Sequence, residues 1–337
     1  MTTTLRLPTP NSWYALAFSS ELKPGTVLTR RLAGQDLVVY RTRSGKANVT
    51  GAYCPHLGAH LGHGGTVVGE EIRCPFHAFR FDLDGRCTAT GYGTKPPPTA
   101  RLNVWPVREA NGIVFVWYDS RGLPPAWTPP ALDMRGWTRM HRRAFTLRDH
   151  PQETVENGVD IGHFAIVHGY SDVQVEQDIC IDGPVFRTAY AATRPMPGLG
   201  RLGAKVRFHF ELAAYGLGYS LVHVRVPRFG VRSRLFILAT PTEPDRITLH
   251  LALSLRKVNP GKQYHPLLGI VPGGLLSNLI ARAVHASLVH DANQDFVIWE
   301  NKRYVHPPAL AQGDGPIGKF RTWARQFYHE QPVVIEA

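Results

Sequence analysis

Short apolar runs bounded by turn-forming residues mark the first third of the chain and predict β-strands joined by turns. The clearest strands are residues 37–40 and 113–118, and the second follows Asn111-Gly112, a dipeptide typical of tight hairpins. Turn-forming residues at 43–46 and 82–85 separate further short segments. Residues 13–118 are therefore predicted to form a β-rich region.

A proline-rich segment at 123–130 ends this pattern and predicts a domain boundary. A helix is expected to begin near Pro151, because proline is tolerated in the first turn of a helix. Alternating segments that predict an antiparallel sheet then occur at 205–212, 219–226, 235–240 and 247–255. Apolar residues at helical spacing predict helices in the second half of 267–289, near 293–304 and near 316–328.

Composition indicates a globular protein with two domains. The 337 residues are 43% hydrophobic and 19% charged, and the length allows each domain its own core. With only four cysteines we expect a reducing, cytoplasmic location, in which Cys87 and Cys180 are buried thiols and not a disulfide. The first ten residues lack the apolar segment of a signal peptide. Residues 267–289 are interrupted by Pro272 and Arg282, so no membrane span is expected.

The formal net charge of +12 favours a well-solvated surface and could steer an acidic partner. Nucleic acid is not expected as a partner, because the basic residues are spread along the chain and no aromatic-basic binding motif accompanies them.

Two loops offer the strongest chemical signal. The pattern is C-x-H, then seventeen residues, then C-x-x-H, and its members are Cys54, His56, Cys74 and His77. Two thiolates and two imidazoles could hold zinc, but zinc fingers usually pair cysteine with cysteine and histidine with histidine. Here each loop supplies one of each. This favours a Rieske [2Fe-2S] cluster, in which one iron takes both thiolates and the other both imidazoles.

A second constellation follows Pro151. If the segment is helical, Asn157, Asp160, His163 and His168 lie within an arc of about 140°. Two histidines and a carboxylate from elsewhere would form the facial triad that binds Fe(II) and leaves positions open for dioxygen. Gly158 and Gly162 weaken the helix, so a kinked or widened turn is expected.

The third iron ligand should be a carboxylate on another element, and two candidates follow the amphipathic segment. Asp291 suits the N-cap of the helix expected after it. Asp295 lies inside that helix beside apolar Phe296 and needs a partner if it is buried. The residues alone leave this choice open.

At this point the chain resembles a known family, the terminal oxygenase components of Rieske non-heme iron oxygenases. The resemblance matches Cys54, His56, Cys74 and His77 to the cluster ligands, and His163 and His168 to the iron ligands. Asp160 matches the acid that links a cluster histidine of one subunit to an iron histidine of the next. Asn157 stands three residues before it, as in the monooxygenase-like branch, whereas ring-hydroxylating dioxygenases have an interval of four.

Later segments extend the resemblance. Gln294-Asp295 is similar to the third-ligand segment, which favours Asp295. Residues 313–328 are similar to the tail of the steroid-active branch, the 3-ketosteroid hydroxylases and cholesterol 7-desaturases. The implied fold is α+β: a β-rich Rieske domain, 1–122, followed by a helix-grip catalytic domain with an antiparallel sheet, 123–337. Family members commonly form head-to-tail homotrimers.

The resulting expectation is a monooxygenase-type enzyme that uses O2 to hydroxylate or desaturate a bulky apolar, steroid-like substrate. No G-x-G-x-x-G nucleotide motif follows a strand, so electrons should come from a separate NAD(P)H-dependent reductase or ferredoxin. The substrate pocket is expected to be lined by residues 267–279 and by the sheet. Two alternatives stay open: a Rieske electron carrier without oxygenase activity, and a lipid-binding protein.

Overall fold

The computed structural model describes residues 3–195, 205–258 and 272–336. Contacts divide the chain into two compact units. One comprises residues 1–10, 134–239 and 245–337, and the other comprises 11–133 and 240–244. The first ten residues are thus grouped with the later part of the chain. The domain boundary between 122 and 123 stays a prediction.

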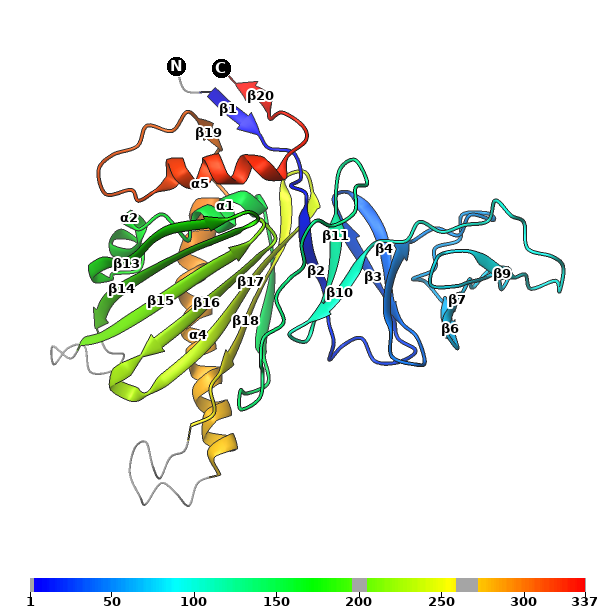
Figure 1. Cartoon of the computed structure of the whole chain (residues 1–337), viewed down its shortest axis with the longest axis horizontal. Helices are drawn as coiled ribbons and strands as arrows, with labels where there is room; N and C mark the ends of the chain where they lie inside the picture. The colour runs from blue at the N-terminus through cyan, green and yellow to red at the C-terminus, as the bar shows by residue number, and fades with distance from the viewer. Residues whose placement is uncertain (1–2, 196–204, 259–271, 337) are drawn as a thin grey trace. The chain divides into compact units, whose positions relative to one another are not determined.

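The unit of residues 11–133 is built from three small antiparallel sheets (Figure 1). The first contains β2 (Ser12–Phe18), β10 (Val107–Ala110) and β11 (Ile113–Tyr118). The second contains β3 (Val27–Leu32), β4 (Gln35–Arg41) and β5 (Ala47–Gly51). The third contains β6 (Thr66–Val68), β7 (Glu71–Arg73), β8 (Arg80–Phe81) and β9 (Cys87–Ala89).

The predicted hairpin is confirmed. Ala110 pairs with Ile113, and the two residues between them have positive φ, 58° at Asn111 and 75° at Gly112. A two-residue turn with both φ values positive matches the right-handed twist of the strands that it joins. Strand β11, predicted from residues 113–118, is buried from Ile113 to Trp117 and lies between β10 and β2.

The other unit is organised by a seven-stranded antiparallel sheet with the order β12-β18-β17-β16-β15-β14-β13. Its strands are β12 (His141–Leu147), β13 (Ser171–Asp182), β14 (Val185–Pro195), β15 (Lys205–Tyr215), β16 (Tyr219–Val226), β17 (Val231–Glu243) and β18 (Arg246–Leu255). The four alternating segments of the sequence correspond to β15 to β18, so the predicted antiparallel sheet is confirmed. Alternation predicts it because successive side chains of a strand point to opposite faces.

The remaining elements surround this sheet. The helices are α1 (Pro151–Glu156), α2 (Gly162–Ile166), α4 (Gly273–Trp299) and α5 (Ile317–Ala324), with short 3-10 turns η2 (Pro227–Phe229) and η4 (Arg325–Phe327). A small sheet joins the two ends of the chain through β1 (Thr3–Arg6), β19 (Val305–His306) and β20 (Val333–Glu336).

Helix α4 runs along one face of the large sheet (Figure 1). Ala281 packs against Leu253 and Leu255 of β18. Phe296, further along the helix, makes an edge-to-face contact with Phe145 of β12 at a centroid distance of 4.8 Å. Burial of this face, and not local propensity, provides most of the stability of such a helix.

Two predictions about this region are wrong. The helix does not restart near residue 293, because α4 is continuous from Gly273 to Trp299. Asp291 is therefore an interior helix residue and not an N-cap. The predicted amphipathic helix itself is confirmed, since Ile280, Val284 and Leu288 recur at helical spacing and pack against the sheet.

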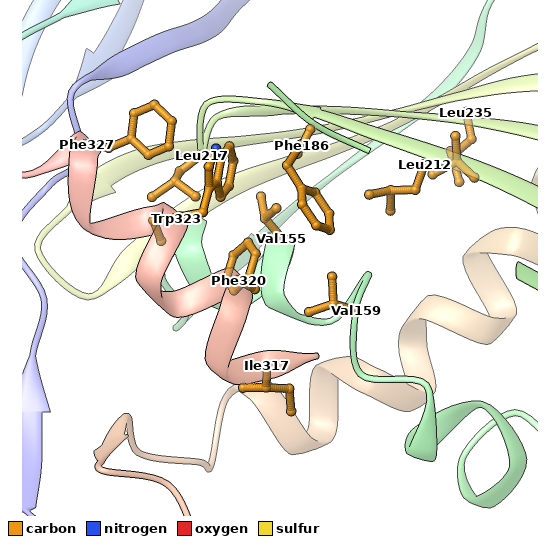
Figure 2. Packing of buried hydrophobic residues seen from close by; sticks show 13 residues of the cluster. Val155, Val159, Phe186, Leu212, Leu217, Leu235, Ile317, Phe320, Trp323 and Phe327 are labelled. Atoms are coloured by element: carbon orange, nitrogen blue, oxygen red, sulfur yellow. The ribbon is translucent and has the colours of Figure 1, made fainter. Parts of the chain in front are cut away.

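Helix α5 covers the end of the sheet near α1 (Figure 2). Ile317, Phe320 and Trp323 pack against Val155 of α1 and Phe186 of β14 in one buried cluster. Phe320 is fully buried. This cluster fixes α1, the helix that leads into the predicted iron ligands.

Helix α1 begins as predicted, with Pro151 in its first turn. The Nδ1 atom of the N-cap residue His150 accepts a hydrogen bond from the main-chain N–H of Gln152 at 3.2 Å. The helix ends at Glu156, so residues 157–168 are not one continuous helix. At Gly158 a Cβ atom would lie 2.6 Å from Leu212 Cδ1, so a larger residue there would require the leucine side chain to move.

Two other expectations concern the surface of the protein. The four cysteines are free, but Cys180 is exposed and Cys87 is half-buried, so the prediction that both are buried thiols is wrong. Within residues 3–195, 205–258 and 272–336, no helix has the length and apolar character needed to cross a membrane.

A buried carboxyl group in this unit generates a test of the fold. Burial raises the pKa of Asp149 to about 7, and the Glu153 carboxylate adds to the increase. An unfolded aspartate ionises near pH 4, so the folded state holds an extra proton between about pH 4 and pH 7. Asp149 should therefore stabilise the fold at low pH, and this contribution should be lost as the pH rises through 7.

Between pH 5 and pH 8 the free energy of unfolding of wild type should fall by roughly 2–3 kcal/mol because of Asp149. We expect this fall to be absent in Asp149→Asn. Urea unfolding of wild type and variant at both pH values measures it. Asp245→Asn, at an exposed carboxylate, is the matched control and should leave the wild-type pH dependence unchanged. A variant at Asp149 with the wild-type slope would contradict the assignment.

Candidate metal centres and cavity

The two cysteine-histidine loops have the same backbone design. In the first loop the main-chain N–H of Cys54 donates to the carbonyl of Ala59 at 2.9 Å. In the second the N–H of Cys74 donates to the carbonyl of Phe79 at 2.8 Å. Each cysteine thus closes a six-residue turn on itself. The loops connect β5 to β6 and β7 to β8.

Each turn also needs a residue with positive φ five places into it. This residue is Gly58 in the first loop, with φ 74°, and Ala78 in the second, with φ 53°. Glycine adopts this conformation without steric cost, whereas alanine does so at a cost in free energy.

The loops bring the four predicted cluster ligands together. Cys54 and Cys74 are buried, 3% and 2% exposed, and the rings of His56 and His77 are 4.7 Å apart and half-buried. Phe79 stacks on His56 at a centroid distance of 4.3 Å and an angle of 7°. The thiols therefore form the inner pair and the imidazoles the outer pair.

The electrostatics of the thiols fit a cationic cofactor. Burial, with the neighbouring thiol of Cys74, raises the pKa of Cys54 to about 11. Two adjacent buried thiolates are costly unless a metal supplies positive charge, because only the thiolate form binds metal. Two thiols inside and two imidazoles outside fit the donor set of a Rieske [2Fe-2S] cluster.

A second group of ligands meets in the other unit. One donor atom each from His163, His168 and Asp295 lies within 4.8 Å of the other two. The Nε2 atom of His168 is 3.3 Å from Oδ1 of Asp295. The three side chains come from α2, the turn after it and α4.

Hydrogen bonds to the other ring nitrogens orient both imidazoles. The Nδ1–H of His163 donates to the main-chain oxygen of Asp160. The Nδ1–H of His168 donates to Oε1 of Gln294 at 3.0 Å. Each bond fixes the tautomer in which Nε2 keeps its lone pair, so both rings can offer Nε2 to a metal.

The two candidate carboxylates have different partners in the structure. Asp291 forms a salt bridge with Arg194, with Oδ2 2.7 Å from Nη1, and Arg194 also stacks over the ring of Tyr170. Asp295 lies one helical turn later on the same face and is directed at His168. Asp291 is thus already neutralised by a cation, whereas Asp295 has only imidazoles as partners in this cluster.

The charge balance of this cluster fits a cation. Burial by itself would lower the pKa of His168, but hydrogen bonds with Asp295 and Gln294 outweigh it and raise the pKa above its ordinary value. The site thus favours positive charge between the ring and the carboxylate. Two imidazoles and one carboxylate, all more than half buried, fit the facial triad of a non-heme Fe(II) site.

Asn157 and Asp160 lie at the edge of this cluster. The Nδ2 atom of Asn157 is 3.4 Å from Nε2 of His163. The carboxylate of Asp160 is 3.8 Å from Nδ1 of His163, and its side chain is 37% exposed. Burial by itself would raise the pKa of Asp160, but hydrogen bonds from His163 outweigh it and lower the pKa.

The triad opens into an apolar cavity of about 200 Å³ between α4 and the large sheet. Its walls are mostly aliphatic and aromatic side chains from β14 to β18, and they include Tyr190, Phe210, Leu212, Val222, Val224, Leu235, Ile237, Leu249 and Leu251. The helix contributes Leu288, Ala292 and Trp299. The prediction that 267–279 line the pocket fails for residues 272–279, and residues 267–271 lie outside the described part of the chain.

Sequence reasoning did not identify the residues that support this site. Arg194 and Tyr170, which hold Asp291, lie on segments that showed no motif. Gln294 appeared only as a neighbour of Asp295. Helical spacing could have indicated it, since residues 291, 294 and 295 share one helix face.

Comparison with known proteins identifies the family. A family model described as the Rieske [2Fe-2S] domain matches residues 12–106. A second, described as the 3-ketosteroid 9alpha-hydroxylase C-terminal domain, matches residues 116–328. The chain belongs to the Rieske non-heme iron oxygenases. It is an oxygenase component with a Rieske cluster and a mononuclear iron, as predicted, and the interpretation as a plain electron carrier is not favoured.

Curated relatives of this Rieske oxygenase cover nearly the whole chain. A cholesterol 7-desaturase of Bombyx mori is 33% identical over 97% of this chain and 71% of its own length. A cholesterol 7-desaturase of Xenopus laevis is 32% identical over 95% of this chain and 72% of its own length. A probable 3-ketosteroid-9-alpha-monooxygenase oxygenase component of Rhodococcus rhodochrous is 30% identical over 94% of this chain and 79% of its own length.

Solved structures share the fold at low identity. NdmA of Pseudomonas putida CBB5, in a variant bound to caffeine, aligns with a TM-score of 0.70, at 17% identity over 96% of each chain. Dicamba monooxygenase bound to dicamba aligns with a TM-score of 0.67, at 17% identity over 94% of this chain and 96% of that chain. The predicted fold of a Rieske domain and an α+β domain with an antiparallel sheet is therefore confirmed.

The separation of the two carboxylates yields a metal-binding prediction. Wild type purified without oxygen should contain about three irons and two acid-labile sulfides per chain. Asp295→Asn should contain about two irons and two sulfides, as should a His163→Ala/His168→Ala variant. Asp291→Asn should keep about three irons, but it should be less stable because Arg194 loses its partner.

Elemental analysis, a sulfide assay and back-titration with Fe(II) measure these values. The back-titration separates a missing site from iron lost during purification. Loss of iron from the Asp291 variant with retention in the Asp295 variant would reverse the assignment.

Proposed function

We propose that this Rieske oxygenase hydroxylates or desaturates a sterol- or steroid-like substrate bound in the apolar cavity. The observation that carries the proposal is the position of the His163, His168 and Asp295 cluster on the wall of that cavity. A purely electron-carrying protein needs neither the cluster nor the cavity. The relatives named as cholesterol desaturases and 3-ketosteroid monooxygenases support this substrate class.

The size and lining of the cavity also support a hydrocarbon substrate. An apolar cavity of about 150 Å³ can hold benzene. A cavity of about 200 Å³ therefore has room for the reacting ring of a polycycle. Side chains such as Leu212, Val222 and Ile237 exclude water from this ring, which prevents side reactions with solvent during turnover.

Each predicted site residue has a role in this proposal. Cys54, Cys74, His56 and His77 hold the [2Fe-2S] cluster. His163, His168 and Asp295 hold the Fe(II), which supplies the binding and reduction of dioxygen when it is present. Asp160 and Gln294 orient the two imidazoles, and Asn157 limits the space beside His163.

Asp160 is also proposed to connect subunits. In a head-to-tail homotrimer its exposed carboxylate would bridge His163 of its own subunit to His77 of the neighbour. Its exposure supports this role, because a carboxylate buried within one subunit could not reach another. The bridge would provide the path for single electrons between the two metal centres.

The electrons come from a separate protein, as the term oxygenase component implies. We propose an NAD(P)H-dependent reductase, a ferredoxin or both. The net charge of +12 suits an acidic ferredoxin. A cytoplasmic location is part of the same proposal.

Turnover with a surrogate reductase tests the substrate class. With NADH and O2, a 3-ketosteroid or a sterol should gain one oxygen atom or lose two hydrogen atoms, detected by mass spectrometry. Asp295→Asn should reduce the rate by more than about 100-fold, because the metal contributes several kcal/mol to such reactions. Product from small aromatic acids alone would contradict the proposed substrate, and equal product from the variant would contradict the site.

The bridge is tested by Asp160→Asn. This variant should keep about three irons and two sulfides per chain. The reductase should still reduce its cluster, but under single-turnover conditions the reduced cluster should not be reoxidised with formation of product. The isosteric amide keeps the shape of the side chain and removes its charge. Normal turnover of the variant would exclude the bridging role.

A further inference from the structure

The polar groups on the cavity wall are nearly all engaged within the protein. Thr154 donates its hydroxyl to Asp149 at 2.8 Å, and Asp291 is held by Arg194. Tyr170 accepts a hydrogen bond from Arg194 at 3.4 Å. These groups are not available to a ligand without loss of an existing contact.

Ser220 is different. It lies on β16, lines the cavity and is only 3% exposed. Among the described residues, none forms a hydrogen bond with its Oγ atom. A buried hydroxyl without a partner destabilises the protein, so such groups usually have a partner that is absent from the protein itself.

Its surroundings exclude a partner from the neighbouring strands. Ser220 pairs with Ala214 on one side and Ile237 on the other, and the next cavity residue along β16 is Val222. None of these side chains has a polar atom. Serine is thus the single polar side chain in an aliphatic part of the wall.

We propose that the Ser220 hydroxyl is the hydrogen-bond anchor for an oxygen atom at one end of a polycyclic substrate. The inference rests on the proposed function and narrows it to an oxygenated sterane that carries a carbonyl or hydroxyl group. In the unliganded structure the packed walls cover this Oγ atom. Rotation of the side chain to another staggered rotamer turns the Oγ–H toward the ligand oxygen, and the hydrogen bond fixes how far the ring system enters the cavity. This positioning decides which C–H bond lies beside the Fe(II) ligands.

The position of Ser220 along the strand supports a long substrate. Phe210 packs against Phe164, next to the ligand His163, with a centroid distance of 6.4 Å. Phe210 pairs with Val224, and Ser220 lies four residues from Val224 on the same face of β16. At about 3.3 Å per residue this is about 13 Å along the strand. The row of cavity residues from Ser220 to Val224 is therefore longer than a single ring, and a fused polycycle can lie along it.

Tyr190 is the other cavity residue whose buried hydroxyl lacks a hydrogen bond within the described chain. The side chain of Thr188 lies near it, and this proximity partly offsets the effect of burial, which raises the pKa of Tyr190. A small rotation could therefore supply a partner within the protein. Ser220 has no such neighbour on its paired strands and is the better anchor.

Ligand binding tests the anchor without turnover. The probes are 5α-androstane, 5α-androstan-3-one and 5α-androstan-17-one, which differ only in the carbonyl and its end of the molecule. Quenching of tryptophan fluorescence gives the dissociation constants, and Trp299 on the cavity wall is the expected reporter. Wild type should bind one of the two ketones about tenfold more tightly than androstane.

Ser220→Ala should abolish this preference, weakening the preferred ketone about tenfold and leaving androstane unchanged or slightly tighter. The variant should unfold at the same urea concentration as wild type or a higher one, because the hydroxyl has no partner to lose. Ser254→Ala is the matched control. It removes a hydroxyl that donates to the Thr138 carbonyl at 2.7 Å on β18, away from the cavity. It should lower stability and keep the ligand preference.

The outcomes separate the two proposals. Binding of all three probes with no preference in wild type, or a preference that persists in Ser220→Ala, would overturn the anchor and leave the steroid cavity standing. Failure of wild type to bind any of the three would count against the proposed function itself, and the anchor would fall with it.

Discussion

The packing of α4 on the seven-stranded sheet is the constraint on which the iron site depends. His168 and Gln294 are 126 positions apart in the chain, yet they share a hydrogen bond of 3.0 Å. Only a helix held in one register on the sheet can keep them there. The same packing sets Asp295 beside His168 and encloses the cavity between helix and sheet. The His163, His168 and Asp295 cluster and the apolar cavity are thus two results of one helix-sheet interface.

The two metal centres are built in different ways. The cluster loops are local: each closes a six-residue turn with one main-chain hydrogen bond, and a short four-stranded sheet holds the turns together. The proposed iron ligands are gathered from two short segments and a distant helix. A local design tolerates changes elsewhere in the chain, whereas a gathered site is sensitive to any shift of the helix. Ligands held by second partners, such as Asp160 for His163, reduce this sensitivity.

Few charged side chains line the cavity. The helix face directed at it carries two aspartates one turn apart, which would repel each other in an apolar environment. Arg194 neutralises Asp291, and a cation in the triad would neutralise Asp295. The remaining wall is apolar except for a few hydroxyl groups. This separation of a charged end from an apolar body suits a substrate that is mostly hydrocarbon and reacts at one carbon.

The sequence by itself determined features that depend on neighbours within a few residues. The Cys-x-His and Cys-x-x-His loops, the Asn111-Gly112 hairpin and the alternating strands were all predicted, because turn chemistry and the two-residue period of a strand are local properties. The pair His163 and His168 was also evident. However, the two histidines do not share one continuous helix, because α1 ends at Glu156 and α2 begins only at Gly162.

Only the tertiary structure distinguishes Asp291 from Asp295. Both lie on one face of α4, and local spacing treats them alike. Arg194, on a distant strand, meets the first and leaves the second for the histidines. For the same reason, the sequence did not reveal which residues line the cavity or that the hydroxyl of Ser220 lacks a hydrogen bond. Whether a polar group has a partner depends on which strands lie beside it, and that pairing is a property of the whole fold.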